Sequence, residues 1–125
     1  MEEEKSKIWI DENGIVNIKI MVKNLSEKDM EELIKEGKEI AKNLTEKALI
    51  LVDISSGLIA ISSRFRRDIA EEIKKLAIDP GFKKLAIFGG VLPRTVASFV
   101  ITASGVKNMK VFKTKDEALR WLREP

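Results

Sequence analysis

The polar residues best placed for chemistry follow the most apolar stretch of the chain. Residues 49–52 are consecutive aliphatics, and Asp53, Ser55 and Ser56 come directly after them. A carboxylate at the end of a buried strand could act as a general base if burial raised its pKa. No second convergent acid and no activated nucleophile accompany it, so the pattern favours a carboxylate that caps its own loop. We therefore predict no catalytic residue.

Four of the six arginines lie at the predicted starts of two helices, which the helix dipole makes unfavourable for cations. A bound anion would offset this cost, since backbone N–H groups and guanidinium forks would both face it. The residues that could form such an anion or ligand site are Asp53, Ser55, Ser56, Ser62, Arg64, Arg66, Arg67, Arg94 and Thr95. An equally good interpretation is that the arginines pair along their own helix with Asp68, Glu71 or Glu72.

The composition excludes several classes of function. The chain has no Cys and no His, so it has no disulfides, no thiol chemistry and none of the usual zinc ligands. We expect no metal and no cofactor. The net charge of +3 is too small for a dedicated nucleic-acid binder. The charged residues, mainly Lys and Glu, make up 34% of the chain, which is typical of heat-adapted proteomes.

The sequence shows neither a membrane-spanning segment nor the features of a secretory signal. No apolar run approaches the roughly 20 residues that span a bilayer. The residues Met1-Glu2-Glu3-Glu4 are acidic where a secretory signal would be basic. We therefore expect a cytoplasmic protein that does not span the membrane.

The first third of the chain predicts a hairpin and a helix. Two apolar runs, residues 8–10 and 15–20, flank Asp11-Glu12-Asn13-Gly14, which is typical of a hairpin with an Asn-Gly turn. Asn17 and Lys19 suggest that this hairpin has one wet face. A helix then begins at Ser26, with an apolar stripe at intervals of three and four residues that would pack on a sheet.

The remaining chain alternates helices and strands. Residues 49–54 form the central strand, and Ser62 or Ser63 caps a helix that ends at Asp79-Pro80-Gly81. Further segments are a strand at 85–88, a helix at 94–104 with Pro93 at its first position, a strand at 110–112 and a helix capped by Thr114. The order ββαβαβαβα predicts one α/β domain over residues 1–125, in which crossover helices connect parallel strands after the hairpin.

Three of these segments carry a family resemblance. The Asn-Gly hairpin precedes an acidic helix, Leu51-Val52-Asp53-Ile54-Ser55 forms an aliphatic-Asp-aliphatic-Ser strand, and Lys110-Val111-Phe112 precedes the closing helix at 116–122. Together they resemble a STAS domain (sulfate transporter and anti-sigma-factor antagonist) of the SpoIIAA-like branch, which is often grouped with the CRAL-TRIO lipid-transfer proteins. The resemblance covers nearly the whole chain and implies a SpoIIAA-like sandwich.

The resemblance also implies a phosphorylation site. In anti-sigma-factor antagonists a partner kinase phosphorylates the second Ser of an Asp-Ser-Ser-Gly motif at the start of the second helix. An ungapped alignment on the central strand places Ile61-Ser62-Ser63-Arg64 at this motif, which makes Ser63 the implied phosphosite. Ile61 and Arg64 depart from the family pattern. The alternative is that both serines only cap the helix.

Two further segments are more apolar than their predicted positions require. Residues 57–61 should form a polar loop, and residues 96–103 are apolar around nearly the whole helix. They could fill the core, line a pocket for an apolar ligand or form a contact surface. We favour a partner surface made of Leu58, Ile59, Ile61, Val96, Phe99 and Val100, with a homodimer as its least demanding form.

These observations favour a non-enzymatic STAS-like binding or regulatory module that acts through protein–protein contacts, as a homodimer or with a regulatory partner. The alternative is a carrier or sensor of a small amphipathic, lipid-like or anionic ligand.

Overall fold

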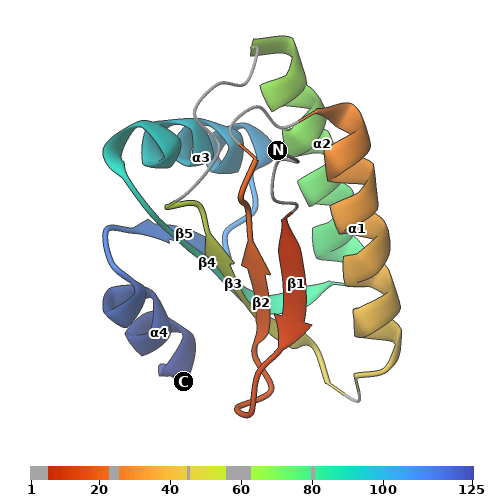
Figure 1. Ribbon diagram of the computed structural model, residues 1–125, viewed down its shortest axis with the longest axis vertical. Helices are drawn as coiled ribbons and strands as arrows, with labels where there is room; N and C mark the ends of the chain where they lie inside the picture. Colours follow the sequence, from red (N-terminus) through yellow and green to blue (C-terminus); the bar gives the residue numbers. More distant parts are fainter. Residues whose placement is uncertain (1–5, 23–25, 45, 56–62, 80) are drawn as a thin grey trace, which may run out of the picture.

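The computed structural model describes residues 6–22, 26–44, 46–55, 63–79 and 81–125 (Figure 1). Within them the elements, in chain order, are β1 (Lys7–Ile10), β2 (Val16–Lys19), α1 (Glu27–Lys42), β3 (Ala48–Asp53), α2 (Ser63–Ile78), β4 (Phe82–Phe88), α3 (Val91–Ser104), β5 (Met109–Phe112) and α4 (Lys115–Arg123). This order is the predicted ββαβαβαβα.

The strands form one mixed sheet in the order β1-β2-β3-β4-β5. β1 and β2 pair antiparallel, and all other neighbouring strands pair parallel. β3 is therefore the central strand, as its continuous apolar run predicts. The predicted fold class, an N-terminal hairpin followed by parallel strands with crossover helices, is confirmed.

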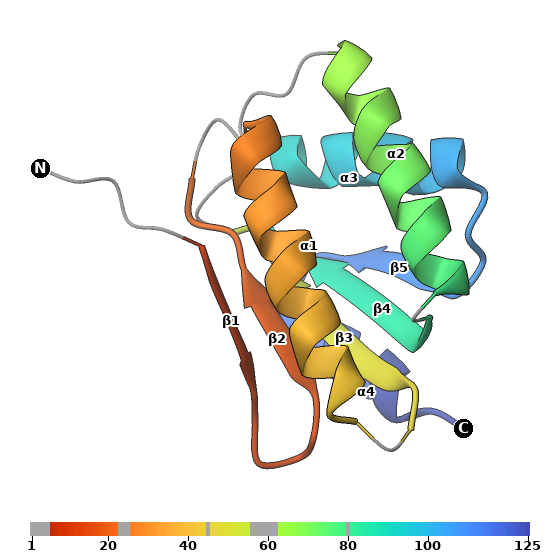
Figure 2. The same ribbon diagram turned by 90° about the vertical axis from the view of Figure 1, so that its right-hand side faces the viewer.

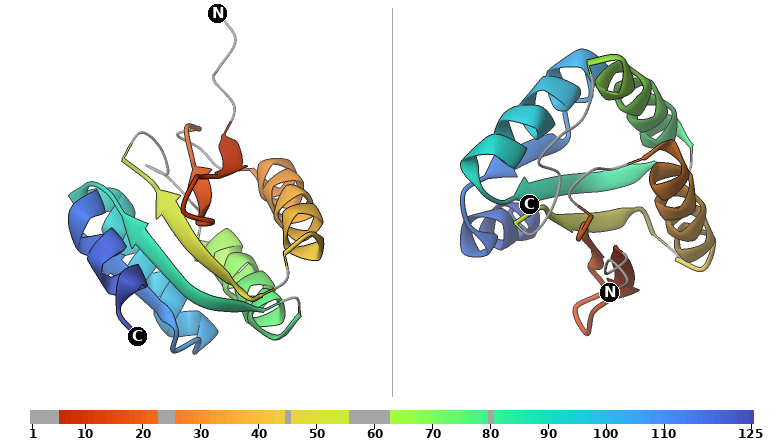
Figure 3. Two further views of the ribbon diagram at one scale, coloured as in Figure 1. Left: turned by 90° about the horizontal axis from the view of Figure 1, so that it is seen from below. Right: turned by 45° about the horizontal axis from the view of Figure 1, so that its top comes forward.

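The helices cover the two faces of the sheet unequally, as Figure 3 shows. α1, α2 and α3 lie on one face, where Val52, Ile69 and Val100 belong to the larger apolar core. α4 lies on the other face, where Ala118 and Leu122 pack in a smaller core around Leu51 and Ala86. The face with three helices also contains a hollow, which lies between those helices and the sheet.

The hairpin turn is held together by Asp11. The Asp11 amide donates to the carbonyl of Ile15 at 3.0 Å, and Gly14 closes the turn with a φ of 78° that suits glycine. The Asp11 carboxylate accepts hydrogen bonds from the amides of Asn13 and Ile15 at 2.9 and 3.1 Å. Its second oxygen accepts one from Asn17 Nδ2 at 2.9 Å. The carboxylate thus satisfies the amides that a wide turn leaves without backbone partners.

Asn17 differs from its predicted position on a wet face. It is 7% exposed. Its side-chain amide donates both to Asp11 and to the carbonyl of Ile15, at 3.0 Å for the latter. A buried amide needs such partners, and the hairpin turn supplies them. The polar residue Asn17 in β2 therefore stabilises the turn through these hydrogen bonds. The prediction of solvent exposure at Asn17 is wrong.

Helix α1 begins as the sequence predicts. Ser26 is the N-cap, its hydroxyl accepts from the Asp29 amide at 3.1 Å, and Asp29 accepts in return from the Ser26 amide at 3.0 Å. This capping box satisfies two of the amides that a helix start leaves unpaired.

Helix α3 begins three residues before the predicted start. It opens at Val91 after the N-cap Gly90, so Pro93 occupies the third helical position and not the first. Proline is tolerated there because the first four amides of a helix have no partner within the helix. Gly89 precedes the helix at a close approach of the backbone, since a Cβ there would lie 2.7 Å from Cγ1 of Ile54.

Candidate functional site

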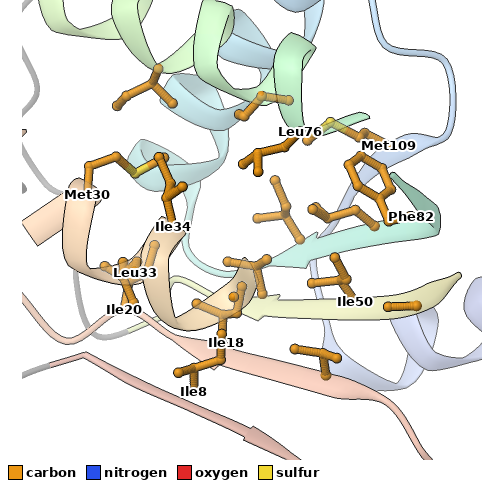
Figure 4. A pocket seen from close by; sticks show the side chains of 18 of the residues that line it. Ile8, Ile18, Ile20, Met30, Leu33, Ile34, Ile50, Leu76, Phe82 and Met109 are labelled. Carbon is orange, nitrogen blue, oxygen red and sulfur yellow. The ribbon is translucent and has the colours of Figure 1, made fainter. Parts of the chain in front are cut away.

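An apolar hollow lies between the sheet and helices α1, α2 and α3 (Figure 4). Its volume is about 200 Å³. Side chains from both sheet and helices point into it, and those labelled in the figure are Ile8, Ile18, Ile20, Met30, Leu33, Ile34, Ile50, Leu76, Phe82 and Met109. We call this hollow the apolar cavity.

The cavity exists because α1 lies over the sheet without burying its apolar stripe. No residue of α1 is fully buried. Met30, Leu33 and Ile34 are only half-buried although they face the sheet, and so are Ile18 and Ile50 beneath them. Side chains this apolar would normally be packed at the density of an organic crystal. Their incomplete burial on both sides indicates room for an additional apolar group.

The size and chemistry of the cavity suit a small apolar molecule. Its volume exceeds the roughly 150 Å³ of an engineered apolar cavity that binds benzene. It is below the about 300 Å³ at which pockets for drug-sized ligands begin. A site of this kind offers water few polar partners, so an apolar group suits it better than water does.

One charged side chain is included among the lining residues that the structure describes. Lys38 lies in α1, four residues after Ile34 and three before Ala41, on the part of the helix that borders the cavity. The other described lining side chains are aliphatic, aromatic or methionine, apart from glycines without a side chain. The cavity therefore combines an apolar body with a single cation.

Four residues of the predicted anion site lie near the carboxyl edge of the sheet, where β3 and β4 end: Asp53, Ser55, Arg94 and Thr95. The Ser55 amide donates to Asp53 Oδ1 at 2.8 Å, which is the loop-capping role expected of such a carboxylate. Arg94 Nε donates to the carbonyl of Gly90 at 3.3 Å, and the Thr95 hydroxyl donates to that of Val91 at 3.1 Å. These bonds stay within one loop and one helix start, so an anion here remains a prediction.

The other members of that predicted site are distributed differently. The Arg66 guanidinium lies over the ring of Phe99, 5.8 Å from its centroid, and Arg67 is exposed. Ser56 and Ser62 lie outside the described residues, as do the side chains of Ser63 and Arg64. α2 begins at Ser63. The predicted capping role of Ser62 or Ser63 and the predicted phosphosite at Ser63 both concern side chains outside the described part of the chain, so they remain predictions.

Only part of the predicted partner surface is exposed to solvent. Val96 and Val100 are each 6% exposed and belong to the core beneath α3. Phe99, on the same helix, is 45% exposed. Leu58, Ile59 and Ile61 lie outside the described residues. Of the predicted surface in α3, Phe99 is therefore the residue that could contact a partner.

The apolar cavity was only partly foreseeable. Val96 and Val100 do line it, in agreement with the alternative that the apolar third helix borders a pocket. The sequence does not predict that α1 lines a cavity, because its apolar stripe is equally typical of a helix that packs tightly on a sheet. Lys38, a charged residue between Ile34 and Ala41 on the edge of that stripe, is the signal that could have indicated a site.

The described residues offer neither a metal site nor a membrane span. No group of three or more carboxylate, His or Cys side chains is placed to hold a metal ion. No helix within the described ranges is both long and apolar enough to cross a membrane.

Comparisons with known proteins agree on the fold. A family model described as SpoIIAA-like matches residues 15–123. A solved structure from Shewanella loihica PV-4, an uncharacterized protein of the DUF3478 family with a SpoIIAA-like fold, superimposes with a TM-score of 0.61 at 23% identity. The match covers 94% of this chain and 91% of that one. No curated protein matches the sequence.

Proposed function

The chain belongs to the SpoIIAA-like family, and on this premise we propose that it is a non-enzymatic binding module that carries or senses a small apolar ligand. The observation that carries the proposal is the apolar cavity of about 200 Å³ beneath α1, α2 and α3. A dry cavity of this size loses packing contacts, and a bound apolar molecule would restore them.

The lining residues support binding in preference to catalysis. Among the described lining side chains there is no carboxylate, hydroxyl or amide, and Lys38 is the one group that could exchange a proton. A catalytic pocket normally brings several polar groups together around the reacting atoms. The carboxylate of Asp53, the candidate general base, instead accepts hydrogen bonds from its neighbour Ser55.

The position of α1 supports access for a ligand. α1 buries no residue completely, whereas α2 and α3 bury Ile69, Ala70, Val96 and Val100. Elements with few buried apolar contacts open at the lowest free-energy cost. We therefore propose that the ligand enters by displacement of α1.

The test is a variant that fills the cavity. Ala41 lines it from α1, and Ala41→Leu adds carbon atoms to the empty volume. The matched control, Ala103→Leu, makes the same change at an exposed site in α3. Fluorescence of the two-ring dye 1-aminonaphthalene reports binding, and thermal unfolding reports stability.

We expect the wild type and Ala103→Leu to bind the dye and Ala41→Leu to lose binding. Because the new side chain occupies empty space, Ala41→Leu should change the free energy of unfolding by less than about 1 kcal/mol. A loss of about 1–3 kcal/mol, typical of overpacking, together with no dye binding by the wild type, would show that the cavity is closed in solution. Independently of these variants, native mass spectrometry of protein from its own source would identify any retained molecule.

A second candidate function, a module acting through protein–protein contacts, is favoured by one observation. Phe99 is 45% exposed on α3, and the guanidinium of Arg66 lies over its ring. An aromatic residue with a neighbouring arginine is typical of residues that dominate protein interfaces. The two functions are compatible, because the cavity lies on the other side of α3 from Phe99.

A further inference from the structure

We infer that the ligand of the apolar cavity is an amphipathic monoanion, an apolar carboxylate whose acid group pairs with Lys38 while its chain or ring fills the cavity. The inference rests on the proposed function and names the chemical class of the ligand. It concerns a different place from the anion site predicted at the carboxyl edge of the sheet.

The first observation is the lack of a charged partner for Lys38. The two ion pairs among the described residues join Lys42 to Glu39 and Lys75 to Glu72. Neither involves Lys38. A lysine at the edge of an apolar site lays its carbon chain along the apolar wall and keeps its ammonium at the rim. The ammonium of Lys38 is therefore placed to meet an anionic group at the mouth of the cavity.

The second observation is another lysine beside a residue that lines the cavity. A Cβ at Gly81, a lining residue, would lie 3.5 Å from Cε of Lys47 and 3.6 Å from its Nζ. Lys47 immediately precedes β3, whose first residue, Ala48, also lines the cavity. Figure 2 shows the C-terminal end of α1 beside the start of β3. A second cation thus lies next to the lining residues Gly81 and Ala48, near the start of β3.

The positive charge of Lys38 and Lys47 favours an anionic ligand over a cationic one. A carboxylate gains a charge-assisted hydrogen bond from an ammonium group. A cationic ligand would meet the charge of Lys38 in the lining, with Lys47 beside the lining residue Gly81, and like charges at a binding site act against the wrong ligand. No acidic side chain is found among the described lining residues.

The volume limits the apolar part of the ligand. About 200 Å³ accommodates a ring or a short to medium acyl chain. It does not accommodate a lipid with two long chains, because pockets for drug-sized molecules already begin at about 300 Å³. The class is therefore a single-chain or aromatic monocarboxylate.

Isothermal titration with a matched pair of probes, octanoate and 1-octanol, tests the inference. Lys38→Met removes the charge but keeps the length and apolar contacts of the side chain. Lys38→Arg restores the charge, and Lys28→Met is the control at an exposed position of α1. We expect the wild type, Lys38→Arg and Lys28→Met to prefer octanoate. Lys38→Met should bind octanoate about fivefold more weakly and 1-octanol unchanged, the size expected of a partly exposed ion pair.

Each outcome decides a different point. Equal affinities for octanoate and 1-octanol, unchanged in Lys38→Met, would overturn the anionic class and leave the apolar cavity as a binding site. No binding of either probe by the wild type would overturn the proposed function together with this inference. Loss of both probes in Ala41→Leu, with the preference for octanoate intact in the wild type, would support both.

Discussion

The ammonium group of Lys84 lies 2.8 Å from the carbonyl oxygen of Trp121 and 5.0 Å from the centroid of its ring. Lys84 belongs to β4, and Trp121 lies in the last turn of α4. The same ammonium donates to the carbonyl of Glu124 at 2.7 Å. The last carbonyls of a helix have no partner within the helix and carry its negative dipole end, so a cation stabilises them. One lysine of the sheet thus caps the helix that covers its smaller core.

Replacing Lys84 should weaken the attachment of α4. Lys84→Met keeps the carbon chain but removes the side-chain donor from the Glu124 carbonyl and leaves the Trp121 carbonyl with the Glu124 amide at 3.2 Å. We expect the free energy of unfolding to fall by about 1–2 kcal/mol. The control is Lys83→Met, an exposed neighbour, which should change it by less than about 0.5 kcal/mol. Urea unfolding followed by Trp fluorescence measures both. Equal stabilities of the two variants would show that the cap contributes nothing.

The Asp11 carboxylate should make the hairpin sensitive to acid. Burial raises the pKa of Asp11, but the hydrogen bonds from Asn17, Ile15 and Asn13, with the charge of Lys115, lower it by more. The folded pKa is therefore below the ordinary value of 3.8. Above pH 3.8 the ionised Asp11 carboxylate contributes its full share to the stability of the fold. This contribution is lost as the pH falls through the folded pKa.

The variant Asp11→Asn should reduce this acid sensitivity. We expect it to be less stable than the wild type at pH 7, with the difference shrinking as the pH falls below 3.8. Glu12→Gln, at the exposed neighbouring position, serves as the control and should follow the wild type. Urea midpoints measured across this acid range provide the comparison, and a difference that is constant with pH would contradict the proton linkage.

Gly37 offers a stabilising change inside α1. A Cβ at this position would lie 3.8 Å from Cδ1 of Ile8, an ordinary van der Waals contact. Because glycine in a helix interior costs about 0.5–1 kcal/mol relative to alanine, Gly37→Ala should stabilise the protein by about that amount. Thermal unfolding gives the measurement. A lower melting temperature would mean that α1 lies closer to β1 in solution than the 3.8 Å contact allows.

Local sequence patterns predict most of the fold. The apolar run before Asp53 marks the central strand, and the capping serine and threonine at Ser26 and Thr114 mark helix starts, because these signals are contained within a few residues. The start of α3 was misplaced because Pro93 is compatible with any position in the first turn. Asn17 was misread because its partner, Asp11, lies on the other side of the turn.

The candidate site is less visible in the sequence, for a physical reason. An apolar stripe that packs tightly and one that borders a cavity have the same residue types and spacing. Whether Met30 and Leu33 touch the sheet closely depends on how α1 is held by its neighbours. The family resemblance could indicate the fold, but the distance between a helix and a sheet is a property of the whole structure.

Phe99 provides the test of the predicted homodimer. It is exposed on α3 although Val96 and Val100, on the same helix, are buried in the core. In a two-fold symmetric interface each subunit would contribute the same ring. Full burial of an exposed Phe is worth about 1.5–3 kcal/mol, and burying the 45% of Phe99 that is still exposed would be worth roughly half of that. Phe99→Lys would remove this gain and add a cation close to Arg66, whose guanidinium lies 5.8 Å from the ring centroid.

We expect sedimentation velocity to show a dimer for the wild type and a monomer for Phe99→Lys at the same concentration. Ile78→Lys, which replaces an exposed aliphatic residue at the end of α2, is the matched control and should remain dimeric. The unfolding midpoint of Phe99→Lys should stay close to that of Ile78→Lys, because neither side chain belongs to the core. A wild-type protein that sediments as a monomer at high concentration would rule out the dimer and leave Phe99 as an exposed contact for Arg66 alone.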